Sequence, residues 1–213
     1  MFDFDPLFST PLSVPYAGQA RMRLVIGGGL ANARVRIDPS AVDLIRIDPD
    51  CGPAPRLRAD GATVRVVWAR SFGEWARYAL AGARPAPEIV LHPDAEWSLL
   101  IHGGASDVRF ELAGAKIAGV EIGGGCSEVD LELPAISHAT QVRIFGGASQ
   151  VRVCRPAGIG VSVAITGGAC AFQLDDQSFD AIGGRTFLHG RGGGDGPRYD
   201  LAVSGGASDL AVL

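Results

Sequence analysis

A glycine-rich step repeats through the chain and constrains its fold more than any other feature. The clearest copy, VRIFGGASQVRV at residues 142–153, places Gly-Gly-Ala-Ser between two short segments of alternating apolar and polar residues. Further copies lie at residues 24–37, 99–112, 120–133, 163–174 and 201–212. The glycine pairs at Gly103, Gly124, Gly146 and Gly167 follow one another at intervals of 21, 22 and 21 residues, and the pair at Gly205 comes 38 residues later. A repeat of this period predicts equivalent units that stack on one another.

The apolar pattern changes parity across each step. Val142 and Ile144 share one strand face, but strict alternation would then place the apolar Val151 on the opposite face. The step must therefore shift the register, as a β-bulge or a corner does. Glycine accepts positive φ and close backbone approach, so we assign the shift to the glycine pair.

Two architectures fit such a unit. The step is either a tight turn in an antiparallel hairpin or a corner in a β-solenoid. Stacked coils explain why equivalent positions are alike, because small residues would form one column, and Arg109, Asp130 and Arg152 would alternate in charge. We therefore expect an all-β fold, a single-stranded parallel β-solenoid (β-helix) of about 21-residue coils with one short helical insertion. The small residues of the expected column are Ala105, Cys126, Ala148, Ala169 and Ala207.

Outside the repeats, the chain divides into an arm and a solenoid domain. Residues 1–20 combine Phe2, Phe4 and Phe8 with several prolines, which exclude a helix and favour an N-terminal arm. Residues 21–213 form the expected solenoid domain, with an insertion at about 70–96. Strands are expected at 41–48 and 62–69, and a capping box followed by helical spacing predicts a short helix over 72–81.

The last repeat ends without a polar cap. We therefore expect an open sheet edge after residue 212, which either pairs with another copy or is covered by the arm. Residues 181–196 form a degenerate unit or a long loop.

Charge and composition exclude several classes of protein. The net charge of −4 gives no electrostatic case for nucleic acid or an anionic membrane. Lys116 is the only lysine, which leaves little room for Schiff-base chemistry or a phosphate-binding loop. The N-terminus lacks the pattern of a signal peptide, and no window is apolar enough to span a membrane. A cytoplasmic location is the resulting expectation.

No residue pattern predicts a catalytic, cofactor or metal site. The four histidines and four cysteines are scattered and show no metal-binding spacing. The recurring serines follow the repeat, whereas a nucleophile is a single residue. Asp175 and Asp176 are adjacent, so in a strand they would point to opposite faces and not act as a pair.

The recurring GGAS steps, together with the segments 97–133 and 155–213, resemble a group of bacterial β-solenoid domains. These are domains of the putative-adhesin type and the C-terminal domains of membrane-bound cell-wall-stress regulators. The resemblance covers residues 21–213 and implies a parallel β-helix with a non-catalytic role in scaffolding, adhesion or sensing. The chain differs from the regulators because it contains no transmembrane segment.

The leading hypothesis is a non-enzymatic scaffold or binding module that associates with a protein partner or with itself through its open ends. A carbohydrate-binding or carbohydrate-processing β-helix is the first alternative, with an aromatic group near the insertion and the carboxylates near residue 175 as its site. The second alternative is a partner-docking module of a regulatory complex, with residues 191–198 as the contact loop. The candidate binding residues are Trp68, Phe72, Trp75, Tyr78, Arg191, Asp195 and Arg198.

Overall fold

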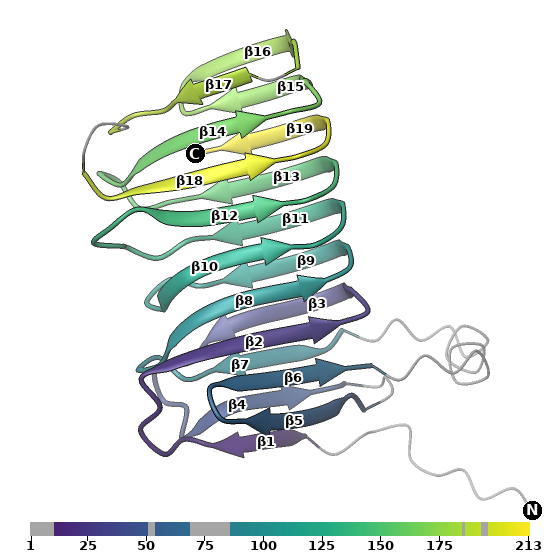
Figure 1. Ribbon diagram of the computed structural model, residues 1–213, viewed down its shortest axis with the longest axis vertical. Coiled ribbons are helices and arrows are strands. Elements are labelled where there is room, and N and C mark those ends of the chain that lie inside the picture. The colour runs from purple at the N-terminus through teal and green to yellow at the C-terminus, as the bar shows by residue number, and fades with distance from the viewer. Residues whose placement is uncertain (1–10, 51–53, 69–85, 185, 193–195) are drawn as a thin grey trace, which may run out of the picture.

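Two β-sheets form the described part of the molecule, and their strands stack along its long axis (Figure 1). The computed structural model describes residues 11–50, 54–68, 86–184, 186–192 and 196–213. Ten strands belong to sheet A and nine to sheet B. The strands are β1 Leu12–Pro15, β2 Arg21–Gly27, β3 Leu30–Ile37, β4 Asp43–Asp48, β5 Arg56–Asp60, β6 Thr63–Val67, β7 Glu88–Leu91, β8 Glu96–His102, β9 Ala105–Glu111, β10 Lys116–Ile122, β11 Cys126–Glu132, β12 Thr140–Ile144, β13 Ala148–Cys154, β14 Gly160–Ile165, β15 Ala169–Leu174, β16 Gln177–Ile182, β17 Thr186–His189, β18 Arg198–Val203 and β19 Ala207–Val212.

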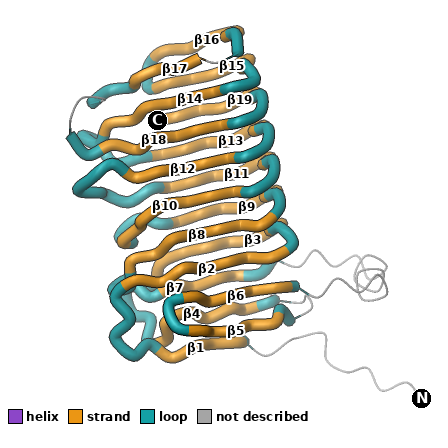
Figure 2. The backbone as a smooth tube through the Cα atoms, in the orientation of Figure 1, coloured by secondary structure: helices purple, strands orange, loops and turns teal. Residues whose placement is uncertain are grey.

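The strand order within each sheet departs from the order along the chain. Sheet A runs β1-β4-β7-β3-β9-β11-β13-β19-β15-β16, and sheet B runs β17-β14-β18-β12-β10-β8-β2-β6-β5. The central strands are parallel, whereas β1, β4, β16, β17 and β5 make antiparallel pairs. Strand, corner and strand follow one another along the chain, so successive strands alternate between the two sheets over most of the molecule (Figure 2).

The expectation of a single-stranded parallel β-solenoid is therefore wrong. Both sheets are mixed, with antiparallel pairs β1–β4, β4–β7 and β15–β16 in sheet A and β5–β6 and β14–β17 in sheet B. No helix occurs among the described residues, and the helix expected over 72–81 lies outside them. The hairpin alternative fails for the repeat as well, because the glycine step joins strands of different sheets, such as β12 and β13.

The C-terminal repeat does not lie at an end of the stack. Strand β19 pairs in parallel with β13 on one side and with β15 on the other, and β18 lies likewise between β12 and β14. The expected open edge after residue 212 is therefore wrong. The sheets end instead at β16 and β17 on one side and at β1 and β5 on the other (Figure 1).

The expected column of small residues is present, in an order that follows the sheet. Cys126 pairs with Ala105 and Ala148, and Ala207 lies between Ala148 and Ala169. All five are buried, because they point between the sheets. The next residues of these units form an outward column, in which the Oγ atoms of Ser127 and Ser208 donate to those of Ser106 and Ser149 at 3.1 Å.

The parity change falls four residues after the glycine pair begins. Ile144 and Ala148 both point inward, four residues apart, so the corner itself preserves parity. Val151 is buried only because Gln150, with φ 53°, adopts a left-handed conformation that inserts one extra residue. Equivalent residues share this conformation in every stacked unit, so the ladder stays in register. They are Asn32, Asp107, Glu128, Gln150, Ala171 and Asp209.

The glycine pairs are required by close stacking of the corners. A Cβ added at Gly167 would lie 2.5 Å from the backbone nitrogen of Gly206, and one at Gly205 would lie 2.7 Å from that of Gly147. Real Cβ atoms do not approach backbone this closely, so larger residues are excluded at these corners. Close backbone approach therefore explains why the first residue of each of these pairs is glycine. The change of parity, in contrast, occurs at the left-handed residues.

The inner faces of the two sheets share one hydrophobic core. Apolar residues at alternate positions of both sheets interdigitate, and the largest fully buried side chains include Trp97, Tyr199, Phe110 and Phe172. Buried polar atoms of the aromatics are satisfied, since Trp97 Nε1 donates to the carbonyl of His92 at 3.0 Å and Tyr199 Oη donates to that of Pro134 at 2.7 Å. Side chains available for binding therefore lie on the outer faces and at the ends.

Candidate binding surfaces

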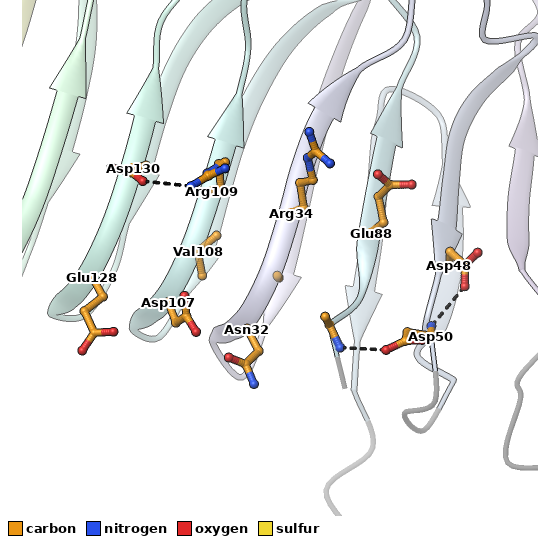
Figure 3. A pocket seen from close by; sticks show the side chains of 12 residues that line it. Asn32, Arg34, Asp48, Asp50, Glu88, Asp107, Val108, Arg109, Glu128 and Asp130 are labelled. Atoms are coloured by element: carbon orange, nitrogen blue, oxygen red, sulfur yellow. Dashed lines mark hydrogen bonds and ion pairs between the residues drawn. The ribbon is translucent and has the colours of Figure 1, made fainter. Parts of the chain in front are cut away.

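An open depression of about 620 Å³ lies on the outer face of sheet A, over β4, β7, β3, β9 and β11 (Figure 3). Cross-strand register builds its floor: Asp48 is opposite Glu88, Glu88 is opposite Arg34, and Arg34 is opposite Arg109. Beside this row lie the left-handed residues of three neighbouring units. Each of them is the extra residue of its strand, and it points toward solvent. The charged and polar residues that line the depression are Asn32, Arg34, Asp48, Asp50, Glu88, Asp107, Arg109, Glu128 and Asp130.

Acidic side chains outnumber basic ones in this depression. It holds six carboxylates and two guanidinium groups. Arg109 lies 3.5 Å from Asp130, whereas Arg34 turns to Glu111 at 2.6 Å, which raises the pKa of Arg34 through the hydrogen bond and the carboxylate charge. The ion pair between Arg109 and Asp130 agrees with the expected alternation of charge between neighbouring units. The depression offers hydrogen-bond acceptors to a polar or cationic partner, and it contains no enclosed cavity that would surround a small molecule.

Local hydrogen bonds fix the acidic chain segment at the margin of the depression. The backbone nitrogen of Asp50 donates to Asp48 Oδ1 at 3.0 Å, and the backbone nitrogen of Ala86 donates to Asp50 Oδ2 at 3.3 Å. These contacts involve β4 and the approach to β7, which lie outside the glycine repeat. The repeat pattern therefore contained no signal for this acidic margin.

The aromatic site expected near the insertion is only partly described. Trp68 is half-buried and packs against the core, so it does not offer an open stacking surface. The other aromatic candidates, Phe72, Trp75 and Tyr78, lie outside the described residues, as does Asp195. The carbohydrate site suggested for this group therefore stays a prediction.

The two remaining candidates, Arg191 and Arg198, pair locally. Arg191 Nη2 lies 3.0 Å from Asp176 Oδ2, and both side chains are largely exposed. A hydrogen bond to its own backbone, followed by this pairing with Arg191, lowers the pKa of Asp176. Arg198 Nε donates to Asp200 Oδ1 at 3.0 Å. Both arginines flank the proposed contact loop, and docking through it stays a prediction.

Asp175 and Asp176 do not form a common site. Asp175 is nearly buried and pairs with Arg155, whereas Asp176 points to solvent. These two carboxylates therefore cannot act together. This agrees with the expectation drawn from their adjacency in the sequence.

His92 and Cys126 are the buried histidine and cysteine among the described residues, and both serve in packing, whereas Cys170 is exposed. His92 is buried, stacks on Tyr16 at a centroid distance of 3.7 Å, and accepts a hydrogen bond at Nδ1 from the backbone of Asp94. Burial raises the pKa of Cys126 to about 11, so this thiol stays protonated at neutral pH. No group of three or more His, Cys, Asp or Glu that could hold a metal ion occurs in the described part of the chain. None of the described residues belongs to a helix that could cross a membrane.

The two ends of the stack differ in their protection against edge pairing. At one end, β5 carries Arg56, Arg58 and Asp60, and β1 ends in Pro15. At the other end, β16 and β17 carry Asp180 as their one acidic residue and no Lys or Arg, and Phe187 is 60% exposed. Charge and proline at an edge oppose pairing with another chain, so the second end is the less protected one.

No family model matches the chain, and no curated protein matches it. A crystal structure of a putative cell adhesion protein from Clostridium sporogenes is similar to it, with a TM-score of 0.62 and 15% sequence identity. The match covers 96% of this chain and 98% of that chain. At this identity the likeness shows the fold alone. It agrees with the adhesin side of the resemblance drawn from the sequence, and it does not show that the Gly-Gly-Ala-Ser repeat is shared.

Proposed function

We propose that this protein is a non-enzymatic scaffold or binding module that associates with a second copy through the end formed by β16 and β17. The sparse charge of these two edge strands is the observation that carries the proposal. Likeness of fold to a putative cell adhesion protein supports a binding role. Charge on β5 and proline at the end of β1 make the opposite end unsuited to the same contact.

The asymmetry of the ends predicts a closed dimer. An open-ended stack would require one end to join the other, whereas a contact between two copies of the same end closes under two-fold symmetry. A two-fold axis perpendicular to the sheets would place β16 antiparallel to its copy and β17 antiparallel to its copy, which extends both sheets across the contact. Exposed Phe187 would then lose contact with water.

Sedimentation velocity of the full chain over a concentration series tests this proposal. We expect a monomer that converts to a dimer and to nothing larger. In antiparallel pairing about the centre of β16, residue 178 faces residue 181 of the second copy. The variant Ser178→Lys with Ala181→Lys therefore places like charges opposite each other and should remain monomeric. Ser178→Lys with Ala181→Glu places opposite charges there and should restore the dimer.

A matched control adds the same charge elsewhere. Val42 and Val67 are exposed by 83% and 44% and lie away from β16 and β17, so Val42→Lys with Val67→Lys should leave the dimer intact. A wild-type chain that stays monomeric at every concentration, or that forms a continuous series of larger species, contradicts the proposal. So does equal weakening by the control.

A further inference from the structure

Arginine side chains gather at one end of the outer face of sheet B. Strands β2, β5 and β6 are neighbours in the order β2-β6-β5, and they carry five arginines against one carboxylate, Asp60. Every one of these arginines is exposed. The concentration of positive charge is local, because the whole chain has a net charge of −4. The five are Arg21, Arg23, Arg56, Arg58 and Arg65.

Strand register places three of these arginines around Arg65. Arg58 on β5 is directly opposite Arg65 on β6. Arg56 is opposite Val67 and Arg23 is opposite Thr63, so both lie diagonally across from Arg65. Adjacent strands lie about 5 Å apart, so the four guanidinium groups can reach one ligand. We call Arg23, Arg56, Arg58 and Arg65 the arginine array.

The positive charge of the arginine array is hardly compensated by carboxylates of the same molecule. Arg21, outside the array, pairs with Glu96 at 2.9 Å, whereas none of the array's four members forms an ion pair with the described residues. Like charges directly opposite each other destabilise a sheet, so the Arg58–Arg65 pair costs stability in the isolated molecule. Such a cost is offset when an anion bridges the two groups.

Edge protection does not account for the array. Charge on β5 alone would suffice to oppose pairing at that edge, and charge of either sign would serve. Arg65 and Arg23 lie on β6 and β2, which are paired on both sides. Their placement adds nothing to protection of the edge.

We propose that the arginine array binds an acidic polysaccharide, through carboxylate or sulfate groups carried along the sugar chain. Guanidinium groups bind such oxyanions in a bidentate manner, which lysine cannot do. The array is part of a sheet face, with aliphatic Val25 and Val67 between the arginines, so it suits an extended chain. Strands β2, β5 and β6 contain no aromatic residue on which bases could stack, which favours a polysaccharide over a nucleic acid.

This site differs from the carbohydrate site that the sequence suggested, and it is independent of the proposed dimer. The array belongs to the end opposite β16 and β17 (Figure 1). The two proposals therefore fail separately: substitutions in the array should leave the dimer mass unchanged.

Titration calorimetry of the full chain with dextran sulfate, polygalacturonate and neutral dextran tests the proposal. The first two probes carry sulfate and carboxylate, and dextran is the uncharged match of the first. We expect binding of at least one charged polymer, weakened by added salt, and no binding of dextran. Arg58→Gln with Arg65→Gln should weaken binding by about tenfold or more, since two charge-assisted contacts are lost.

Arg143→Gln with Arg152→Gln provides the matched control. Both residues are exposed on outer sheet faces away from the array, and they pair in register with Glu121 and Asp130. This control should bind as the wild type does. The proposal is overturned if neither charged polymer binds, if both double variants weaken binding equally, or if an oligonucleotide of similar charge binds as well as the polysaccharides. Loss of self-association in the array variant, without loss of polymer binding, would assign the array to contact between copies and would likewise overturn it.

Discussion

Arg155 and Asp175 form a buried ion pair that joins the two strands on either side of β19. Arg155 Nη2 lies 2.6 Å from Asp175 Oδ1, and the side chains are only 5% and 10% exposed. Arg155 follows β13 and Asp175 follows β15, and their backbone nitrogens donate to Leu213 and Val212 of the chain between them. Asp175 Oδ2 also accepts from the backbone of Arg191 at 2.7 Å. The pair thus holds three strand ends and the following loop together.

Removing one partner of this pair should be costly. Asp175→Asn keeps a residue that tolerates the observed φ of 54°, but it leaves the charge of Arg155 buried without compensation. Arg155 Nη1 already has no hydrogen-bond partner. We expect a loss of about 3–5 kcal/mol in the free energy of unfolding, measured by urea denaturation. Adding Arg155→Met should recover most of it, because the double variant buries no unpaired charge.

Asp176→Asn is the control for that experiment. Its carboxylate is exposed and its ion pair with Arg191 is in solvent, so the midpoint of unfolding should barely change. Equal losses for Asp175→Asn and Asp176→Asn would contradict a structural role for the buried pair.

Glycine at the corners is predicted to be irreplaceable for a steric reason. A Cβ at Gly146 would lie 2.7 Å from Gly125 Cα and 2.8 Å from the carbonyl carbon of Gly124. Gly146→Ala should therefore cost at least about 3 kcal/mol of unfolding free energy, the upper end of overpacking penalties. Gly183→Ala meets no atom within 4 Å and should stay within about 0.5 kcal/mol of the wild type. Similar thermal midpoints for the two variants would show that the corners relax easily.

The left-handed residues offer a stabilising substitution. Ala171 has φ 49°, a conformation that disfavours residues with a Cβ. Ala171→Gly should raise the free energy of unfolding by about 0.5–1 kcal/mol, because the strain removed exceeds the added chain entropy. Gln173→Gly, two residues later in the same strand, should lower it by a similar amount. The comparison by chemical denaturation fails if both glycines destabilise the protein.

Stability should fall at alkaline pH. Burial raises the pKa of Cys126 from its ordinary value of 9.0 to about 11, and burial also raises the pKa of Tyr199. Between these pH values the unfolded chain loses the thiol proton while the folded chain keeps it, so the stability present below pH 9 is lost as pH rises toward 11. The slope from the thiol reaches at most about 1.4 kcal/mol per pH unit. Cys126→Ala, which matches its neighbours in the column, should make the decline shallower.

Thiol alkylation followed by peptide mapping gives an independent check. Exposed Cys170 should react in the folded protein, whereas Cys126 should react only on unfolding. Rapid native labelling of Cys126, or an unchanged alkaline slope in Cys126→Ala, would contradict the assigned burial.

The repeat predicted which residues lie side by side better than it predicted the order of the units. Neighbours of Cys126 in the column could be named because small residues recur at that position, and the charges of Arg109 and Asp130 followed in the same way. The order could not be predicted, because equivalent units present similar surfaces above and below, so any unit can stack on any other. The placement of β18 and β19 between earlier strands depends on how the chain returns after β15, and residues 175–197 carry no regular copy of the glycine step.

The depression and the arginine array were harder to predict from the sequence than the strands of the fold. Asn32 and Asp107 are residue types that tolerate a left-handed conformation, and they could have indicated where the parity changes. Glu128 and Gln150 obscure that signal because neither residue type is typical of it. The arginine array depends on β5 lying beside β6, and β5 lies in a segment without the alternating apolar pattern. Only the strand register brings these arginines together.

Interleaving of the last repeat has a consequence for biosynthesis. The strands emerge from the ribosome in chain order, but the layer between β12–β13 and β14–β15 is filled by residues 198–212, which are made after both. The preceding strands must therefore either stay unpaired at this layer until then, or pair with each other first and separate later. Contacts of such long sequence separation slow folding. A nascent chain halted before residue 198 would lack its middle and not merely its tip, and it should resist protease poorly until translation is complete.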